Sequence, residues 1–383
     1  MPRRPQKFIR PGSRPLATTR RRFIQGSAAA VAGVALSNCR QNVADVQSGG
    51  EDGQATTDGN RTLHIYTWAN YTDQALLDAF TEATGIEVVV DIFESNESML
   101  AKMAAGGGDA YSVIYPSDYV IVDMINDGML KEMDQSRIQG LENMMAQWQD
   151  PTYDPGNRYS VPFTWGTTGL LYNQEIISGS LEDWNYLWEN QDALSRRITL
   201  LDDTRETMGA VLKSLGYSYN ATDPAEIEAA YNRLMELKPH IAAFMTDGFE
   251  QQMLGGDLSV VMCYSVEGIA VTEEDERMVY TVPASGSSVW TDTIVIPAGA
   301  PDVDAAYEWI NFVLQPQVSQ GLVERLFTAT PNQAAYDLLS EDLKTNPNLF
   351  PPEEVIARCE GIKPLEDDIN QLYDQYWTQI TSA

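Results

Sequence analysis

Residues 63–93 read LHIYTWANYTDQALLDAFTEATGIEVVVDIF, and this stretch predicts an α/β fold. Residues 63–67 alternate apolar and polar side chains, and residues 86–93 are rich in β-branched side chains, so both are expected to be strands. Between them, Thr72 is expected to cap an amphipathic helix that ends at Gly85, because glycine readily adopts the conformation that closes a helix. The order strand, helix, strand is typical of sheets with helices packed on their faces.

The rest of the chain continues this alternation. Strands are expected at 111–115, 198–201, 260–264, 278–282 and 293–296, and helices after Asp223-Pro224, at 302–314 and at 368–380. Open α/β sheets bind ligands beyond the carboxyl ends of their strands. Residues that follow a predicted strand are therefore the first candidates for a functional site.

The first 39 residues look like an export signal. The stretch Thr19 to Gln25, TRRRFIQ, resembles a twin-arginine signal, and the apolar run from Gly26 to Leu36 is too short to span a bilayer. The run ends at Leu36-Ser37-Asn38-Cys39, which resembles a lipoprotein cleavage site, although Asn38 departs from the usual small residue. We expect a periplasmic protein that carries a lipid on Cys39. The alternative is an uncleaved, weakly hydrophobic tail.

The charge of the chain restricts its partners. The formal net charge is −30, and eight of the 25 Lys and Arg residues lie in the leader, so the exported part is more acidic still. Such a surface repels nucleic acid and anionic lipid and attracts cations into a cleft. Solubility in a salty medium would also explain the acidity. Residues 40–60 are polar and Gly-rich and are expected to form a flexible tether.

Cysteine, histidine and glycine patterns give no cofactor or metal site. The chain has three cysteines, too few for a disulfide framework, and its two histidines, His64 and His240, are far apart in sequence. Gly106-Gly107-Gly108 is not followed by the Gly-Lys-Ser/Thr of a phosphate-binding loop, so a turn is expected there. The chain is too long for one core, and two lobes are expected.

An ordered set of motifs then resembles the polyamine-binding proteins of ABC importers, in particular the spermidine/putrescine-binding branch. The motifs are Ile65 to Tyr71, Thr84 to Val88, Phe93 to Glu97, Pro162 to Gly166, Leu201 to Glu206 and Trp290 to Asp292. They occur in the family's order from about residue 61 to the C-terminus. Each motif alone would be weak evidence, but the ordered set is specific.

The resemblance implies a two-lobed type II periplasmic-binding-protein fold with a ligand cleft between the lobes. Lobe 1 is expected to comprise 61–166 and 291–330, and lobe 2 to comprise 167–290 and 331–383. Hinge crossings are expected near 166–172 and near 285–290. The resemblance further implies a monomeric substrate-binding subunit that hands its ligand to membrane permease subunits and has no enzymatic activity.

A polyamine presents ammonium groups at fixed spacing along a methylene chain, so its site needs carboxylates separated by apolar or aromatic walls. The resemblance places the ligand contacts at Trp68, Asn70, Tyr71, Ser117, Tyr119, Asp203, Glu206, Tyr264, Trp290, Asp292 and Lys363. Trp290 and Asp292 are two residues apart, so in an extended segment both side chains would point the same way.

Local patterns leave other roles open for some of these residues. Asp203-Thr204-Arg205-Glu206 is also a helix-capping sequence. Three positions depart from the family pattern: Asn70 stands where an acid is usual, Tyr264 where a tryptophan is usual, and Lys363 near a polar neutral contact. A lysine in the cleft would oppose a polycation, or it would recognise the carboxylate of an amino-acid-like ligand.

The sequence is compatible with three other functions, the first of which is motivated by Asn70 and Lys363. The second hypothesis is a binding protein for another cationic or zwitterionic solute, such as an ω-amino acid. A non-transport polyamine sensor would share the same cleft. An exported carboxylate-dependent hydrolase is a remote alternative, because the sequence contains no nucleophile elbow or Ser/His/Asp grouping.

Overall fold

The computed structural model of the chain describes residues 61–177 and 179–382. The predicted export signal at 1–39, the predicted lipid site at Cys39 and the predicted tether at 40–60 lie outside the described residues. Within the described part, no helix has both the length and the apolar character needed to cross a membrane.

Among the described residues, nine strands form one continuous sheet in the order β2-β1-β3-β9-β4-β7-β5-β6, with β8 paired to β4. The strands are β1 Thr62–Thr67, β2 Glu87–Ile92, β3 Val113–Ile114, β4 Ser160–Asn173, β5 Ile198–Leu200, β6 Ile241–Phe244, β7 Val260–Tyr264, β8 Met278–Thr281 and β9 Val289–Val295. Parallel pairs join β1 to β2 and β3, and join β5 to β6 and β7. Parallel pairing requires crossover connections, which the intervening helices supply.

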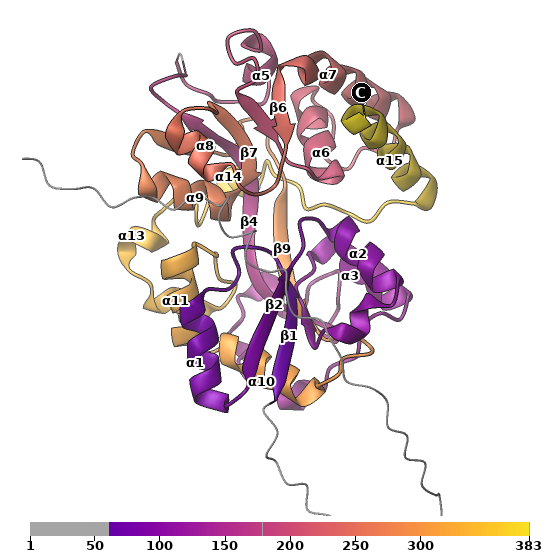
Figure 1. Cartoon of the computed structure of the whole chain (residues 1–383), viewed down its shortest axis with the longest axis vertical. Helices are drawn as coiled ribbons and strands as arrows, with labels where there is room; N and C mark the ends of the chain where they lie inside the picture. Colours follow the sequence, from indigo (N-terminus) through magenta and orange to yellow (C-terminus); the bar gives the residue numbers. More distant parts are fainter. Residues whose placement is uncertain (1–60, 178, 383) are drawn as a thin grey trace, which may run out of the picture. The chain divides into compact units, whose positions relative to one another are not determined.

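Strand β4 connects two halves of this sheet. Its residues 160–167 pair antiparallel with β9, and its residues 168–173 pair with β7 and β8. Figure 1 shows β4 and β9 side by side, with β1 and β2 towards one end and β6 and β7 towards the other. The fold is the two-lobed fold expected from the sequence: lobe 1 is built around β1, β2, β3 and β9, and lobe 2 around β5, β6, β7 and β8. The residue boundaries of the lobes and the two hinge crossings stay predictions.

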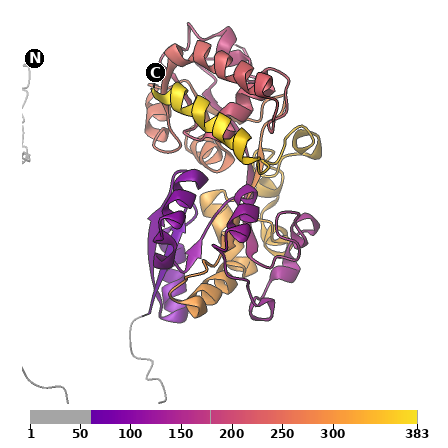
Figure 2. The same ribbon diagram turned by 90° about the vertical axis from the view of Figure 1, so that its right-hand side faces the viewer.

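Helices cover both halves of the sheet. They are α1 Gln74–Thr84, α2 Asn96–Ala104, α3 Asp118–Asn126, α4 Ala146–Gln149, α5 Tyr186–Glu189, α6 Thr204–Ser214, α7 Pro224–Leu237, α8 Glu250–Gly255, α9 Ser265–Glu274, α10 Val303–Val313, α11 Pro316–Leu326, α12 Gln333–Leu338, α13 Glu341–Lys344, α14 Glu353–Ile356 and α15 Asp367–Ser382. Short 3₁₀ helices occupy Gly107–Ala110, Gln135–Arg137, Leu141–Asn143 and Lys238–His240. In Figure 2, the C-terminal helix α15 lies with the helices of lobe 2, and it packs on α6 and α7.

Most of the predicted elements are confirmed, and their ends differ by a few residues. The first helix begins one residue later than expected, since Asp73 and not Thr72 is its N-cap and accepts a hydrogen bond from the Leu76 amide. The Asp73 carboxylate also pairs with Arg325, which holds it in the capping position. Gly85 closes this helix with a φ of 74°, as its sequence position predicted.

Each lobe has its own apolar core. The core of lobe 1 contains buried side chains of β1 and α10, including Leu63, Ile65 and Trp309, and the core of lobe 2 contains side chains of β7 and α7, including Val260 and Leu234. The strand ends that face the space between the lobes carry polar and aromatic side chains instead.

Candidate ligand-binding site

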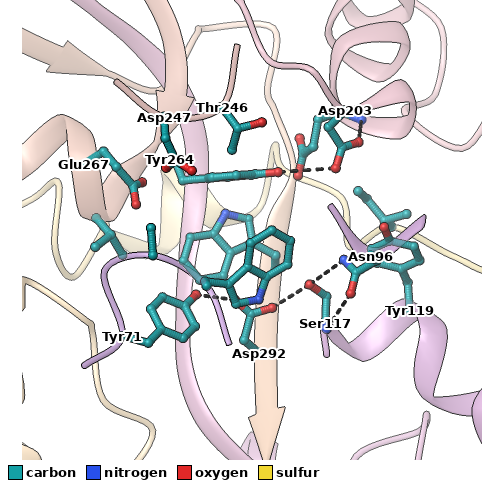
Figure 3. A pocket seen from close by; sticks show the side chains of 16 residues that line it. Tyr71, Asn96, Ser117, Tyr119, Asp203, Thr246, Asp247, Tyr264, Glu267 and Asp292 are labelled. Carbon is teal, nitrogen blue, oxygen red and sulfur yellow. Dashed lines mark hydrogen bonds between the residues drawn. The ribbon is translucent and has the colours of Figure 1, made fainter. Parts of the chain in front are cut away.

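A pocket lies between the carboxyl ends of strands from both lobes. It contains about 560 Å³ of space free of protein atoms, a figure that includes open solvent at its mouth. Its lining consists of five carboxylates, five aromatic rings and a few small or polar side chains (Figure 3). These residues are Trp68, Ala69, Tyr71, Asn96, Ser117, Tyr119, Asp203, Glu206, Thr246, Asp247, Tyr264, Val266, Glu267, Trp290, Asp292 and Ile362.

Asp292 lies on the lobe 1 side of the pocket, on β9. Its carboxylate accepts hydrogen bonds from the Tyr71 hydroxyl and from Ser117 Oγ, the latter at 2.5 Å. Asn96 fixes Ser117 in turn, donating to its hydroxyl at 2.9 Å and accepting from its amide at 3.1 Å. Burial raises the pKa of Asp292 to about 6, and the hydrogen bonds from Ser117 and Tyr71 only partly oppose this shift.

Asp203 and Glu206 lie on the lobe 2 side, at the N-terminus of α6. Asp203 caps this helix through Oδ1, which accepts the Glu206 amide at 2.9 Å. Its other oxygen, Oδ2, accepts the Tyr264 hydroxyl at 3.3 Å inside the pocket. One carboxylate therefore caps the helix and also lines the pocket.

Glu206 is fixed by neighbours in its own lobe. Its carboxylate accepts hydrogen bonds from the Tyr219 hydroxyl at 2.7 Å and from Ser288 Oγ at 2.8 and 3.0 Å. Gly209, one turn along α6, makes this arrangement possible, because a Cβ there would lie only 2.1 Å from the Tyr219 ring. Burial, together with the negative charge of Asp203, raises the pKa of Glu206 to about 7.

Glu267 provides a further carboxylate, from the first turn of α9. Its Oε1 accepts a hydrogen bond from Asn70 Nδ2 at 3.0 Å, whereas its Oε2 is buried and has no hydrogen-bond partner among the described residues. Burial raises the pKa of Glu267 to about 7, and the charges of Asp247 and Glu250 act in the same direction. Burial likewise raises the pKa of Asp247. Figure 3 shows Glu267 and Asp247 on the opposite side of the pocket from Asp203.

Aromatic rings lie between these two acidic ends. The ring of Tyr264 is edge-on to Trp290, with centroids 5.8 Å apart, and edge-on to Trp68 at 6.3 Å. Trp290 and Asp292 line the same pocket, while Thr291 between them points away and accepts a hydrogen bond from Trp148. This is the alternation expected of a strand.

The structure brings together nine of the eleven predicted contact residues. Asn70 does not itself line the pocket but holds Glu267, which does. Lys363 is exposed and lies against a neighbouring cavity with Asp118 and Tyr153, while its neighbour Ile362 lines the pocket. The ligand contacts assigned to Asn70, Lys363 and the other nine residues stay predictions.

Sequence reasoning missed several lining residues, of which Glu267 and Asp247 are charged. Both follow strands, β7 and β6 respectively, so the rule that sites lie beyond strand ends could have found them. Asn96 lies within the motif Phe93 to Glu97, but its hydrogen bonds to Ser117 depend on a fold-level contact between α2 and α3.

The arrangement favours a cationic guest. Among the described residues that line the pocket, none is lysine, arginine or histidine. Carboxylates brought together without a cation raise one another's pKa, and a cation placed among them is favoured by every one of these charges. No group of three or more His, Cys, Asp or Glu among residues 61–177 and 179–382 is arranged to hold a metal ion. A guest that spans both acidic ends must therefore carry its charges apart, with an apolar segment against the rings.

Comparisons with known proteins agree with this geometry. The sequence model of the family described as bacterial extracellular solute-binding protein matches residues 75–351. The spermidine/putrescine-binding periplasmic protein of Escherichia coli is 34% identical over 333 residues, which are 86% of this chain and 94% of that protein.

Two solved structures are similar in fold and sequence. A putative spermidine/putrescine ABC transporter protein from Listeria monocytogenes has a TM-score of 0.79 at 33% identity, covering 84% of this chain and 99% of that chain. The spermidine/putrescine ABC transporter substrate-binding protein of Streptococcus pneumoniae has a TM-score of 0.71 at 34% identity, covering 84% and 99%.

Proposed function

We propose that this chain, which belongs to the bacterial extracellular solute-binding protein family, captures a polyamine and delivers it to a membrane permease. The ligand is spermidine or putrescine, bound in the pocket between the lobes. The observation that carries this proposal is the lining itself: five carboxylates and five aromatic rings, with no basic side chain among the described lining residues.

Each part of the lining suits one part of a polyamine. An ammonium group donates several hydrogen bonds and accepts none, so carboxylates are its natural partners. Asp203 and Glu206 bind the ammonium group at one end of the ligand. Asp292 and Glu267 bind the other ammonium group. A charge-assisted hydrogen bond of this kind is worth about 1.5–3 kcal/mol. The methylene chain lies against Trp68, Tyr264 and Trp290, where its burial contributes about 0.8 kcal/mol per methylene.

The second candidate, a zwitterionic ω-amino acid, is less well supported. Asn70 and Lys363 motivated this candidate, because the carboxylate of an ω-amino acid needs a hydrogen-bond donor or a positive charge in the protein. Asn70 donates to Glu267, and Lys363 does not line the pocket. A ligand carboxylate in this pocket would face five protein carboxylates and no basic side chain of the described lining.

Thermal unfolding and calorimetry with spermidine, putrescine and γ-aminobutyrate test the proposal. A ligand that binds only the folded state raises the melting temperature by mass action, by an amount that grows with its concentration above the dissociation constant. We expect shifts with both polyamines and none with γ-aminobutyrate. A shift with γ-aminobutyrate alone would replace the first candidate by the second.

We further propose that the chain binds its ligand without converting it. The relatives described above are transport proteins, which supports this view. Incubating the protein with spermidine and analysing the amine by NMR should return it unchanged. Any product formed in proportion to protein concentration would support the hydrolase alternative.

The location and partners belong to the same proposal. The family description and the leader together support a periplasmic protein, tethered through a lipid on Cys39, that acts as a monomer with ABC permease subunits. Mass spectrometry of the mature N-terminus is expected to find acylated Cys39. A Cys39→Ala variant should move from the membrane fraction to the soluble periplasmic fraction, and an unchanged distribution would refute the anchor.

A further inference from the structure

The hydrogen bond between Asn70 and Glu267 joins the two lobes at one end of the pocket. Asn70 follows β1, in the sheet half that holds β2 and β3, and Glu267 follows β7, in the half that holds β5 and β6. Asn70 Nδ2 donates to Glu267 Oε1 at 3.0 Å. The amide therefore occupies one oxygen of the carboxylate and fixes the direction of the other.

Glu267 lines the pocket with one of its carboxylate oxygens left unpaired in the described part of the chain. Asn70 does not line the pocket, so its amide contacts the carboxylate from outside the pocket lining. Oε2 is buried without a partner among the described residues. An unpaired buried carboxylate oxygen is costly, and a donor from a ligand would remove that cost.

An amide is the appropriate group to face this carboxylate. Asp247 and Glu250 already place negative charge near Glu267, so an acid at position 70 would add repulsion. Asparagine donates a hydrogen bond without adding charge of either sign. A lysine or arginine there would pair with Glu267 and compete with the ligand for it.

We infer that Asn70 is a positioning residue that orients Glu267 towards the second ammonium of a diamine. The Asn70–Glu267 hydrogen bond forms only when the two lobes are in contact. Contact between the lobes is therefore coupled to binding of the second ammonium group. The inference rests on the proposed amine-binding function. Its consequence is selectivity: the Glu267 end distinguishes a ligand with ammonium groups at both ends from a monoamine of equal length.

Calorimetry with putrescine and butylamine measures this selectivity, since the two amines share four carbons and differ by one ammonium. The wild-type protein should prefer putrescine. Asn70→Ala and Glu267→Gln should each lower the affinity for putrescine about tenfold, the size expected for one charge-assisted hydrogen bond, and change the affinity for butylamine little. Melting temperatures of the unliganded variants check that each folds.

An exchange of the two groups tests whether the carboxylate must be at position 267. Asn70→Asp combined with Glu267→Gln keeps the size of both side chains and moves the carboxylate to the other lobe. Position 70 does not line the pocket, so the double variant should bind putrescine about as weakly as Glu267→Gln alone. Asn70→Asp alone places a second acid beside Glu267 and should raise the pKa of the pair. The pH range over which putrescine affinity rises should therefore move to higher pH.

The outcomes separate the inference from the function on which it rests. If the wild type binds neither putrescine nor spermidine, the proposed function and this inference both fail. If putrescine binds and Asp203→Asn weakens it, while Asn70→Ala and Glu267→Gln leave the ratio of putrescine to butylamine affinity unchanged, only the inference is overturned. A double variant that binds putrescine as tightly as the wild type would also overturn it.

Discussion

Two helices of this chain begin with the same pattern of an aspartate followed three residues later by a glutamate, and they differ in almost everything else. At α7, Asp223 is exposed and caps the helix by accepting the Ala225 amide. At α6, Asp203 and Glu206 are each only 3% exposed, and Asp203 caps the helix while also accepting the Tyr264 hydroxyl in the pocket. Only the α6 pair faces a cavity lined by aromatic rings and other acids.

The difference shows what turns a helix cap into a binding site. A capping acid is stabilised by amide hydrogen bonds and the helix dipole wherever it occurs. At α6 the fold adds burial, which raises the pKa values of both Asp203 and Glu206, and the charge of Asp203 raises the pKa of Glu206 further. Water already stabilises the charge of the exposed capping carboxylate at α7. The buried carboxylates at α6 lack that solvation, so a bound cation stabilises them.

Neutralising the α6 pair should give the largest loss of binding. Glu206→Gln and Asp203→Asn should each weaken putrescine and spermidine binding by about 100-fold, because each removes a buried charge-assisted contact worth roughly 2–3 kcal/mol. Asparagine is itself a good N-cap, so Asp203→Asn should preserve the helix. Calorimetry at pH 7.5 measures the change.

The α7 pair supplies the matched control. Asp223→Asn and Glu226→Gln make the same chemical changes at the same pattern, and both should leave polyamine affinity within about twofold of the wild type, as expected for solvated surface charges. Equal losses at α6 and α7 would mean that net charge, and not the pocket, controls binding.

Asp292 tests the opposite wall of the pocket. Asp292→Asn should weaken polyamine binding at least tenfold, since it removes a charge and leaves one acceptor oxygen in place of the two that accept from the Tyr71 and Ser117 hydroxyls. The loss should add to that of Glu206→Gln only if the two acids hold different ammonium groups. A double variant no weaker than Glu206→Gln alone would place both acids on the same group.

The raised pKa values of the pocket carboxyl groups make polyamine affinity and the stability of the unliganded protein depend on pH in opposite directions. Polyamine ammonium groups resemble that of lysine and stay charged well above pH 7, at a reference pKa of about 10.4. In the free protein Glu206 and Glu267 have pKa values of about 7 and Asp292 of about 6, and a bound cation lowers them. Binding therefore releases protons, and affinity should rise with pH from about 5.5 to 7.5 and then level off. Titrations across this range would contradict the assignment if affinity fell with pH.

The unliganded protein should behave in the other direction. A carboxyl group whose folded pKa is raised stabilises the fold below its unfolded pKa, about 4.3 for glutamate, and this contribution is lost as pH rises through the folded value near 7. The melting temperature without ligand should therefore be higher at pH 5.5 than at pH 7.5. Glu206→Gln should reduce this difference, whereas Glu226→Gln at α7 should not.

Among the pocket variants, the change at Tyr264 should have the smallest effect. Tyr264→Phe keeps the ring beside Trp290 and removes the hydroxyl that donates to Asp203 at 3.3 Å. The loss of this long neutral-donor contact should weaken polyamine binding by about two- to fivefold, or roughly 0.5–1 kcal/mol. A loss as large as that of Asp203→Asn would show that the hydroxyl, and not the carboxylate charge, is the main contact.

The sequence predicted what depends on local pattern. The alternation of β1, the apolar face of α1 and the glycine stop at Gly85 are local signals, whereas the resemblance to polyamine-binding proteins assigned Asp203, Glu206 and Asp292 to one site. Strand β4 was not predicted, because nearly every one of its 14 residues is buried and no alternation appears. It also contains Pro162 and Gly166, which weaken a strand signal.

Glu267 was missed for a related physical reason. Helix α9 begins directly after β7 with Tyr264 as its N-cap and with no side-chain capping hydrogen bond, so its start has no capping residue to mark it. The partnership of Asn70 with Glu267 spans 197 positions of the chain and two lobes. No periodicity or spacing in the sequence encodes such a contact.

Proton release on ligand binding tests the central claim most directly. Calorimetric titration of the protein with putrescine at pH 6.5, in two buffers with different heats of ionisation, gives the number of protons exchanged. We predict net proton release by the wild type, less release by Glu206→Gln and unchanged release by Glu226→Gln. Binding with no proton exchange, or no binding at all, would contradict the account of a buried carboxylate pocket completed by a cation.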